Sequence, residues 1–231
     1  MNKNLKINSH ETLRIGVILS FVGGVLDAHT FLFRNGVFAN TQTGNIVLLA
    51  LFLNTNNTPK TTQCILSIIA FIVGVVLTEL IKIKLKNRDV FNYVSLTLAI
   101  EILFLTIITT IPKNFHNTTV IVIISFICSL QTNAFKSLHK SPYSTTMCTG
   151  NLRSASSYLF YFIFKKSKED FIVCFRYFII IISFFIGALF GKILTNTIGV
   201  NTLLICSLFL TIALLILILH NKKLKKLKWI F

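Results

Sequence analysis

The residues of this sequence that can do chemistry are a carboxylate in an apolar stretch and two copies of one polar motif. Asp27 lies within the apolar run from Ile15 to Phe33, and Thr43-Gly44-Asn45 follows it. The same three residues recur as Thr149-Gly150-Asn151. Charge inside a membrane is costly, so an acid at such a position is commonly part of a proton or substrate site. We therefore start from the hypothesis that Asp27 and both motifs form one site.

Two interpretations of Asp27 follow from its surroundings. A carboxyl group in a low dielectric favours its neutral form, so Asp27 can carry a proton during transport. Alternatively, Asp27 holds helices together by pairing with Arg34, Arg153 or a threonine hydroxyl. The preceding pair Gly23-Gly24 predicts that another helix or a ligand approaches the backbone closely.

Each Thr-Gly-Asn motif offers a hydroxyl, an amide and a glycine at which the backbone can bend. A helix that begins at such a motif inside the membrane would direct its N-terminal N–H groups at an anionic group. Such a break is tolerated only where protein or a water-filled cavity satisfies the backbone. The alternative is an ordinary helix at the membrane surface, with Thr43 and Thr149 as N-cap residues.

Four other polar residues lie in or near apolar runs. Glu101 is either functional or paired with Arg176 in another run. Gln131 and Asn133 either hydrogen-bond between helices or contribute to the site. Glu79 lies near the end of its run and can reach the interface, so we expect a structural or topological role.

Composition places the chain among integral membrane proteins. It is 54% hydrophobic and only 13% charged, with a mean hydropathy of +0.76. The net charge of +16 does not indicate nucleic-acid binding, because the Lys and Arg residues gather at the ends of apolar runs. Its five cysteines are dispersed and odd in number, which predicts free thiols. We expect no metal, no cofactor and no enzymatic activity, since no ligand-spaced histidines, phosphate loop or nucleophile motif is present.

The apolar runs predict six membrane spans within a single domain. A span needs about 20 apolar residues, and the runs that satisfy this are Ile15 to Phe33, Cys64 to Ile83, Phe91 to Ile111, Thr118 to Phe135, Phe171 to Ile193 and Gly199 to Leu219. Two further stretches, Val37 to Leu53 and Ser144 to Phe164, each carry a Thr-Gly-Asn motif. These two stretches either span the membrane or re-enter it.

The distribution of basic residues favours six spans with both termini in the cytoplasm. In that topology 19 of the 23 Lys and Arg residues face the cytoplasm, and the bias weakens if the two extra stretches also span. The four basic residues that do not face the cytoplasm in this topology are Arg34, Lys60, Lys113 and Lys192. We expect a bacterial inner-membrane protein whose basic tail, residues 221–231, orients the last span or lies on the anionic leaflet.

The second half of the chain repeats the first without a gap. Asp27 precedes Asn45 by 18 residues, and Asn133 precedes Asn151 by 18. The repeats cover about 13–112 and 118–220, and three spans in each give the halves opposite orientations. This predicts an inverted repeat, as in secondary transporters whose sites lie between the repeats. A chance recurrence in a chain rich in Thr and Asn is the alternative.

These motifs resemble the YoaK-type family of small bacterial membrane proteins, a family of unknown function. The resemblance rests on Gly24-Val25-Leu26-Asp27-Ala28, Phe38-Ala39-Asn40-Thr41-Gln42-Thr43-Gly44-Asn45, Gln131, Asn133-Ala134 and Thr149-Gly150-Asn151. It implies a six-span inner-membrane protein and supplies no reaction.

The residues favour a small secondary transporter over two other functions. The expected central site comprises Asp27, both Thr-Gly-Asn motifs, Gln131, Asn133 and Glu101, and its partners are the lipid bilayer and a small molecule or ion. The two acids indicate a proton or cation, whereas helix N-termini and basic residues indicate an anion. The alternatives are a membrane scaffold or assembly protein, and a channel. The oligomeric state is open.

Overall fold

The computed structural model describes residues 9–55, 57–85, 90–111 and 117–228. Some residues used to predict topology lie outside this description, namely Lys3, Lys6, Lys86, Arg88 and Lys113, together with the side chains of the basic tail from residue 221 on.

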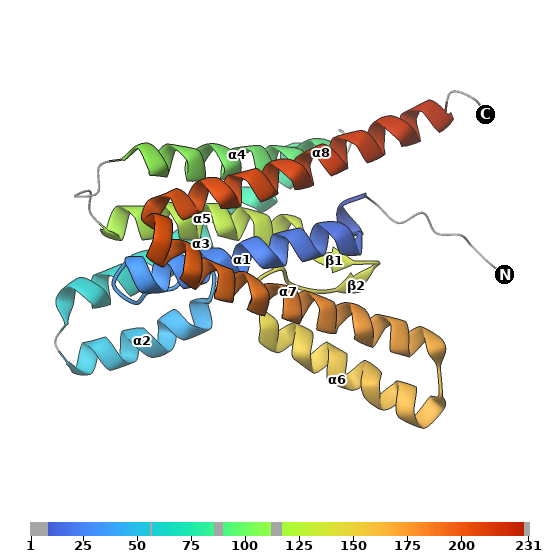
Figure 1. The fold of residues 1–231 in the computed structure, drawn as a ribbon, viewed down its shortest axis with the longest axis horizontal. Helices are drawn as coiled ribbons and strands as arrows, with labels where there is room; N and C mark the ends of the chain where they lie inside the picture. Colours follow the sequence, from blue (N-terminus) through green and yellow to red (C-terminus); the bar gives the residue numbers. More distant parts are fainter. Residues whose placement is uncertain (1–8, 56, 86–89, 112–116, 229–231) are drawn as a thin grey trace.

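The described residues form α-helices, two 3-10 turns and one small hairpin (Figure 1). In chain order the elements are η1 (Ser9–Glu11), α1 (Leu13–Phe33), α2 (Gln42–Asn54), α3 (Thr58–Lys84), α4 (Val90–Thr110), α5 (Asn117–Ala134), β1 (Ser137–Leu138), β2 (Ser141–Pro142), α6 (Cys148–Lys165), α7 (Lys168–Ile198), η2 (Gly199–Asn201) and α8 (Thr202–Lys228). In the antiparallel hairpin, Leu138 pairs with Ser141, and His139 and Lys140 turn the chain at positive φ. The protein is therefore all-α, as predicted.

Five helical stretches in the described residues are long and apolar enough to cross a membrane. They are Leu13–Phe33, Thr58–Lys84, Tyr93–Thr110, Asn117–Ala134 and Lys168–His220. The fifth contains two helices, α7 and α8, with the turn η2 between them. By contrast, α2 is an apolar helix of 13 residues, too short to cross. Large apolar side chains such as Phe185 and Ile193 are more than half exposed, as expected on a surface that faces lipid.

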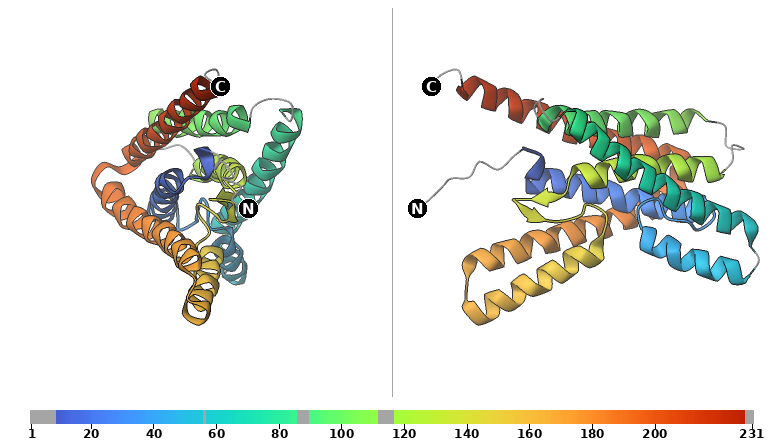
Figure 2. Two further views of the ribbon diagram at one scale, coloured as in Figure 1. Left: turned by 90° about the vertical axis from the view of Figure 1, so that its right-hand side faces the viewer. Right: turned by 180° about the vertical axis from the view of Figure 1, so that it is seen from behind.

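The helices pack in a pattern that interleaves the two halves of the chain. Helix α1 packs mainly against α7, and α5 packs mainly against α3. Helices α2 and α6 each pack on the helix that follows in the chain, α2 on α3 and α6 on α7. Helices α4 and α8 lie side by side and cover α5 and α1 (Figure 2). The main apolar core lies where α1, α4, α5 and α8 meet.

Helices α2 and α6 extend from the bundle as separate arms (Figure 1). Both α2 and α6 begin near the middle of the bundle and run towards opposite ends (Figures 1 and 2). The start of α1 and the end of α8 lie at one end of the bundle, which also holds the hairpin β1–β2 (Figure 1).

Glycines set the closest helix contacts. A Cβ on Gly24 of α1 would collide with the backbone carbonyl oxygen of Phe184 in α7, and a Cβ on Gly187 would collide with that of Phe21. Gly74 of α3 faces Ser129 of α5 in the same way. The close approach predicted from Gly23-Gly24 is confirmed, and it places Asp27 where α1 is packed most tightly.

Candidate functional site

Both oxygens of Asp27 bind the loop that precedes α2. Oδ1 accepts a 2.7 Å hydrogen bond from the backbone N–H of Asn40, and Oδ2 accepts one of 2.5 Å from the Thr41 hydroxyl. Only 4% of Asp27 is exposed. The threonine hydroxyl is therefore the partner found among those considered. Pairing with Arg34 or Arg153 was wrong, because Arg34 donates to Asn117 Oδ1 at 2.8 Å and Arg153 lies exposed on α6.

The asparagines of the two Thr-Gly-Asn motifs make the same local contact. Asn45 Oδ1 accepts from the backbone N–H of Phe38 at 2.9 Å, and its Nδ2 donates to the Phe38 carbonyl at 2.8 Å. Asn151 Oδ1 accepts from the N–H of Ser144 at 3.1 Å, and its Nδ2 donates to the Ser144 carbonyl at 2.6 Å. Each asparagine lies in the first turn of its helix and pins the loop before it.

The threonines of the motifs face away from this contact, and the two glycines differ in their surroundings. Helix α2 has Thr41 as N-cap residue and α6 has Met147, so the prediction that Thr43 and Thr149 are N-cap residues was wrong. Both threonines are exposed. The helices begin earlier than expected because the asparagine side chains, rather than the hydroxyls, fix the entering backbone. A Cβ on Gly150 would meet nothing within 4 Å in the described structure, whereas one on Gly44 would lie 3.1 Å from the Phe38 ring.

The loops that precede α2 and α6 meet on one turn of α1. Asn40 Nδ2 donates to the Gly23 carbonyl at 3.4 Å, and Asp27 holds Asn40 and Thr41 one turn further along. From the other loop, Thr146 packs so closely on Gly23 that a Cβ there would lie 2.6 Å from its methyl group. The segment from Gly23 to Asp27 is thus the contact point of both loops.

Glu101 is fully buried in α4 and is bound by Gln131 of α5. In the amide orientation that satisfies both neighbours, Gln131 Nε2 donates to the two Glu101 oxygens at 3.1 and 3.0 Å, and Oε1 accepts from the Thr145 hydroxyl at 3.3 Å. The expected pairing of Glu101 with Arg176 was wrong. Hydropathy places both residues in apolar runs, but only packing brings α4 against α5.

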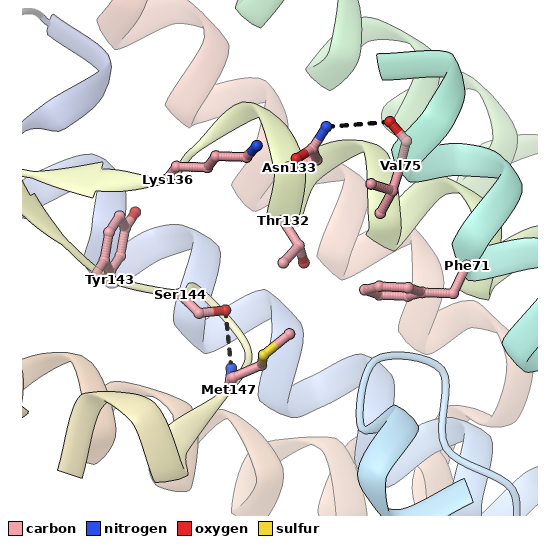
Figure 3. Close-up of a pocket in the computed structure, with 8 residues that line it drawn as sticks. All are labelled: Phe71, Val75, Thr132, Asn133, Lys136, Tyr143, Ser144 and Met147. Carbon is pink, nitrogen blue, oxygen red and sulfur yellow. Dashed lines mark hydrogen bonds between the residues drawn. The ribbon is translucent and has the colours of Figure 1, made fainter. Parts of the chain in front are cut away.

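Asn133 belongs to a second polar cluster, formed with residues of α3. Its Nδ2 donates to the Val75 carbonyl at 3.2 Å and to Glu79 Oε1 at 2.9 Å. Lys82 and Lys136 also contact Glu79 Oε1, at 3.0 and 2.8 Å. Figure 3 shows Asn133, Lys136 and Val75 around the cavity that this cluster borders.

Two cavities flank the meeting point of the loops. The first, of about 310 Å³, is lined by residues of α1, the loop before α2, and α7, including Asp27, Thr41 and Lys192. The second, of about 270 Å³, is lined by residues of α3, α5 and the loop before α6, including Asn133 and Lys136 (Figure 3). The single central site expected from the sequence required Asp27 and Asn133 to share one cavity. Each of them instead lines a different cavity.

The second cavity also has a phenol in its wall. Tyr143 is 9% exposed, and no hydrogen-bond partner of its hydroxyl lies within the described part of the chain. The hydroxyl oxygen itself is buried, and a Cβ added to Gly16 of α1 would lie 3.4 Å from it.

Several residues that build the site were missed from the sequence. Asn40 and Thr41 directly precede the motif and bind Asp27, and Ser67 of α3 accepts from Asn45 at 3.1 Å while bonding to Ser125 at 2.7 Å. Lone serines in apolar spans were the available signal, because a hydroxyl in lipid surroundings needs a partner.

Comparison with known proteins identifies relatives without identifying an activity. Residues 15–216 match the model of a family described as "Protein of unknown function (DUF1275)". The chain is 32% identical to the UPF0700 transmembrane protein YoaK of Bacillus subtilis (strain 168) over 162 residues, which cover 67% of this chain and 71% of that protein. No solved structure matches the chain.

Proposed function

This chain belongs to the DUF1275 family of proteins of unknown function, and from its own site we propose that it is a small secondary transporter of the bacterial inner membrane. The observation that carries the proposal is the contact of two loops on one turn of α1, between Gly23 and Asp27, with a cavity on either side. Non-helical backbone within a membrane is tolerated where protein or a cavity satisfies it. The meeting point of the loops can therefore separate an access route through one cavity from an access route through the other.

An inverted repeat accounts for the packing of the helices. Under the 106-residue offset that aligns Asp27 with Asn133, α1 corresponds to α5 and α2 to α6. The pairs α1–α7 and α5–α3 then become equivalent, as do α2–α3 and α6–α7. The matched contacts of Asn45 and Asn151 support the same relation. In both pairs a helix of one repeat packs against a helix of the other. This arrangement is compatible with transporters in which one repeat or bundle moves against the other.

In the membrane, we propose six crossings and two re-entrant helices. The fifth apolar stretch then crosses twice, because η2 reverses the chain between α7 and α8. Helix α2 has 13 residues and is about 20 Å long, against about 30 Å of hydrocarbon, so it reaches only the middle from one face. Helix α6 has 18 residues but is not among the stretches apolar enough to cross, and as the counterpart of α2 in the repeat it enters from the other face. The excess of basic residues supports a cytoplasmic position for the start of α1 and the end of α8.

A flux assay on the full chain tests the proposal. Purified protein in liposomes is screened for uptake of labelled small metabolites, with and without a proton gradient, against empty liposomes. Saturable uptake that one unlabelled compound inhibits supports transport. Gradient-independent ionic currents would indicate a channel instead, and absence of flux from protein that remains folded would favour a scaffold.

A further inference from the structure

The two cavities are built from corresponding residues of the two halves. Positions 106 apart in the chain supply one wall in each, as for Asp27 and Asn133, Phe38 and Ser144, and Thr41 and Met147. Positions 113 apart supply the opposite wall, as for Phe71 and Phe184, and Val75 and Ala188. The same spacing relates Glu79 to Lys192. A solute that moves from one cavity to the other meets related walls with different charges.

One lysine ammonium lines each cavity, from a different element in each case. Lys192 of α7 lines the first, and Lys136, after α5, lines the second. In the described residues the ion pairs join Glu79 to Lys82 and Lys136, and none includes Lys192. Lys192 is also exposed, so its ammonium is available to a ligand.

The carboxylate in the first cavity is already bound by its own chain. The Asn40 N–H and the Thr41 hydroxyl each occupy one oxygen of Asp27. The second cavity has no carboxylate among its lining residues. Glu79 pairs with Lys136 of its wall and also with Lys82, so this group of three charges keeps one positive charge in excess. The features common to both cavities are therefore one net positive charge from lysine, a threonine in the wall and aromatic side chains.

We propose that the solute of both cavities is a small organic monocarboxylate whose carboxylate binds Lys192 in one cavity and Lys136 in the other. This assignment rests on the proposed transport function. One net positive charge, from Lys192 in the first cavity and from Lys136 with Lys82 and Glu79 in the second, matches a single negative charge on the ligand. A second charge on the ligand would remain without a partner. Aromatic walls, formed by Phe31, Phe38 and Phe184 in one cavity and Phe71 and Tyr143 in the other, suit an apolar body.

Binding beside Asp27 also requires a proton. Two carboxylates in one low-dielectric cavity repel each other, so the ligand enters the first cavity together with a proton on Asp27. The Thr41 hydroxyl can donate to the charged carboxylate or accept from the protonated one. Among the described titratable groups, Lys192 of α7 lines the same cavity as Asp27, and the thiols of Cys128 on α5 and Cys148 on α6 lie close enough to interact with its charge.

Equilibrium binding to the purified full chain tests the ligand class with four probes. The probes are benzoate, its neutral relative benzyl alcohol, its cationic relative benzylammonium and the dianion phthalate. Benzoate is expected to raise the melting temperature in a saturable manner, because a ligand of the folded state stabilises it. The other three are expected to have much smaller effects.

Matched charge variants locate the binding. Lys192→Gln is expected to weaken benzoate binding about tenfold through loss of a charge-assisted contact, and Lys192→Arg to retain most of it. The control Lys60→Gln removes one positive charge elsewhere on the chain and is expected to leave binding unchanged. Stronger binding of benzylammonium or phthalate, no saturable benzoate effect, or equal effects of Lys192→Gln and Lys60→Gln would each overturn the assignment.

The binding and uptake experiments together distinguish an error in the proposed transport function from an error in the proposed class of ligand. Lys192-dependent benzoate binding without uptake into liposomes would overturn transport and retain the class. Saturable uptake of another type of solute by a protein that does not bind benzoate would overturn the class alone.

Discussion

The carboxylate of Asp27 accepts a hydrogen bond of 2.7 Å from the backbone N–H of Asn40, 13 residues further along the chain. This contact fixes the loop before α2 on the middle of α1. Asp27 is thus a structural anchor, in addition to the proton carrier that we propose. Different substitutions separate these two roles.

Asp27→Asn is expected to keep the fold and Asp27→Ala to weaken it. The asparagine Oδ1 can still accept from the Asn40 N–H, and its Nδ2 can donate to the Thr41 hydroxyl. Alanine leaves the buried Asn40 N–H without a partner, at a cost of about 1–3 kcal/mol. Thermal unfolding in detergent measures both. If Asp27 carries the coupling proton, Asp27→Asn abolishes proton-driven uptake, and unchanged uptake would remove Asp27 from that role.

Asn45→Ala is expected to destabilise the protein more than Asn151→Ala. Asn45 binds Gln42 and Ser67 as well as the Phe38 backbone, whereas Asn151 binds the backbone of Ser144. At about 1 kcal/mol for each hydrogen bond, the difference is about 1–2 kcal/mol. Thr43→Ala, which changes an exposed side chain in the same turn, serves as the control. Equal losses for the two asparagines would contradict the assigned contacts.

Gly24→Ala and Gly150→Ala are expected to have opposite effects on stability. The new methyl group at position 24 would lie 2.8 Å from the Ala188 nitrogen and would overlap the Phe184 carbonyl oxygen, which forces α1 and α7 apart. Overpacking of this kind costs about 1–3 kcal/mol or more. Position 150 is helical and open, so alanine there is expected to be neutral or to stabilise by up to about 1 kcal/mol. A melting-temperature comparison in one detergent decides between these outcomes.

Glu79→Gln is expected to cost less than about 1 kcal/mol. The side chains of Glu79 and Lys136 are 47% and 59% exposed, and exposed ion pairs contribute little. Glutamine can still accept the hydrogen bond from Asn133. Urea or thermal titration at low and high salt measures the effect, which should shrink as salt screens the wild-type pairs. A large, salt-independent loss would show that the cluster is more deeply buried in the membrane-embedded protein.

Single cysteines in a variant without native cysteines test the topology. With six crossings and two re-entrant helices, Thr55→Cys is expected to react with an impermeant maleimide on intact cells. Lys140→Cys is expected to react only after the cells are opened. If α2 and α6 crossed the membrane fully, both results would be reversed.

The class of this protein and its tightest helix contact follow from the sequence alone. Long apolar runs identify membrane helices because each run must meet lipid over its whole length. Gly23-Gly24 indicates close packing because only glycine lets two backbones approach so nearly. The spacing of Asp27, Asn133 and the two Thr-Gly-Asn motifs also identifies the family resemblance that the family model confirms.

Only the tertiary structure decides which polar groups are partners. Asp27 binds Asn40 and Thr41 instead of an arginine, Glu101 binds Gln131 instead of Arg176, and Asn133 joins Glu79 on α3. Hydropathy and spacing are local properties of the chain, whereas a buried polar group takes whichever donor or acceptor the packing of distant helices brings within reach. For the same reason, the division of the expected single site into two cavities could not be predicted from the sequence.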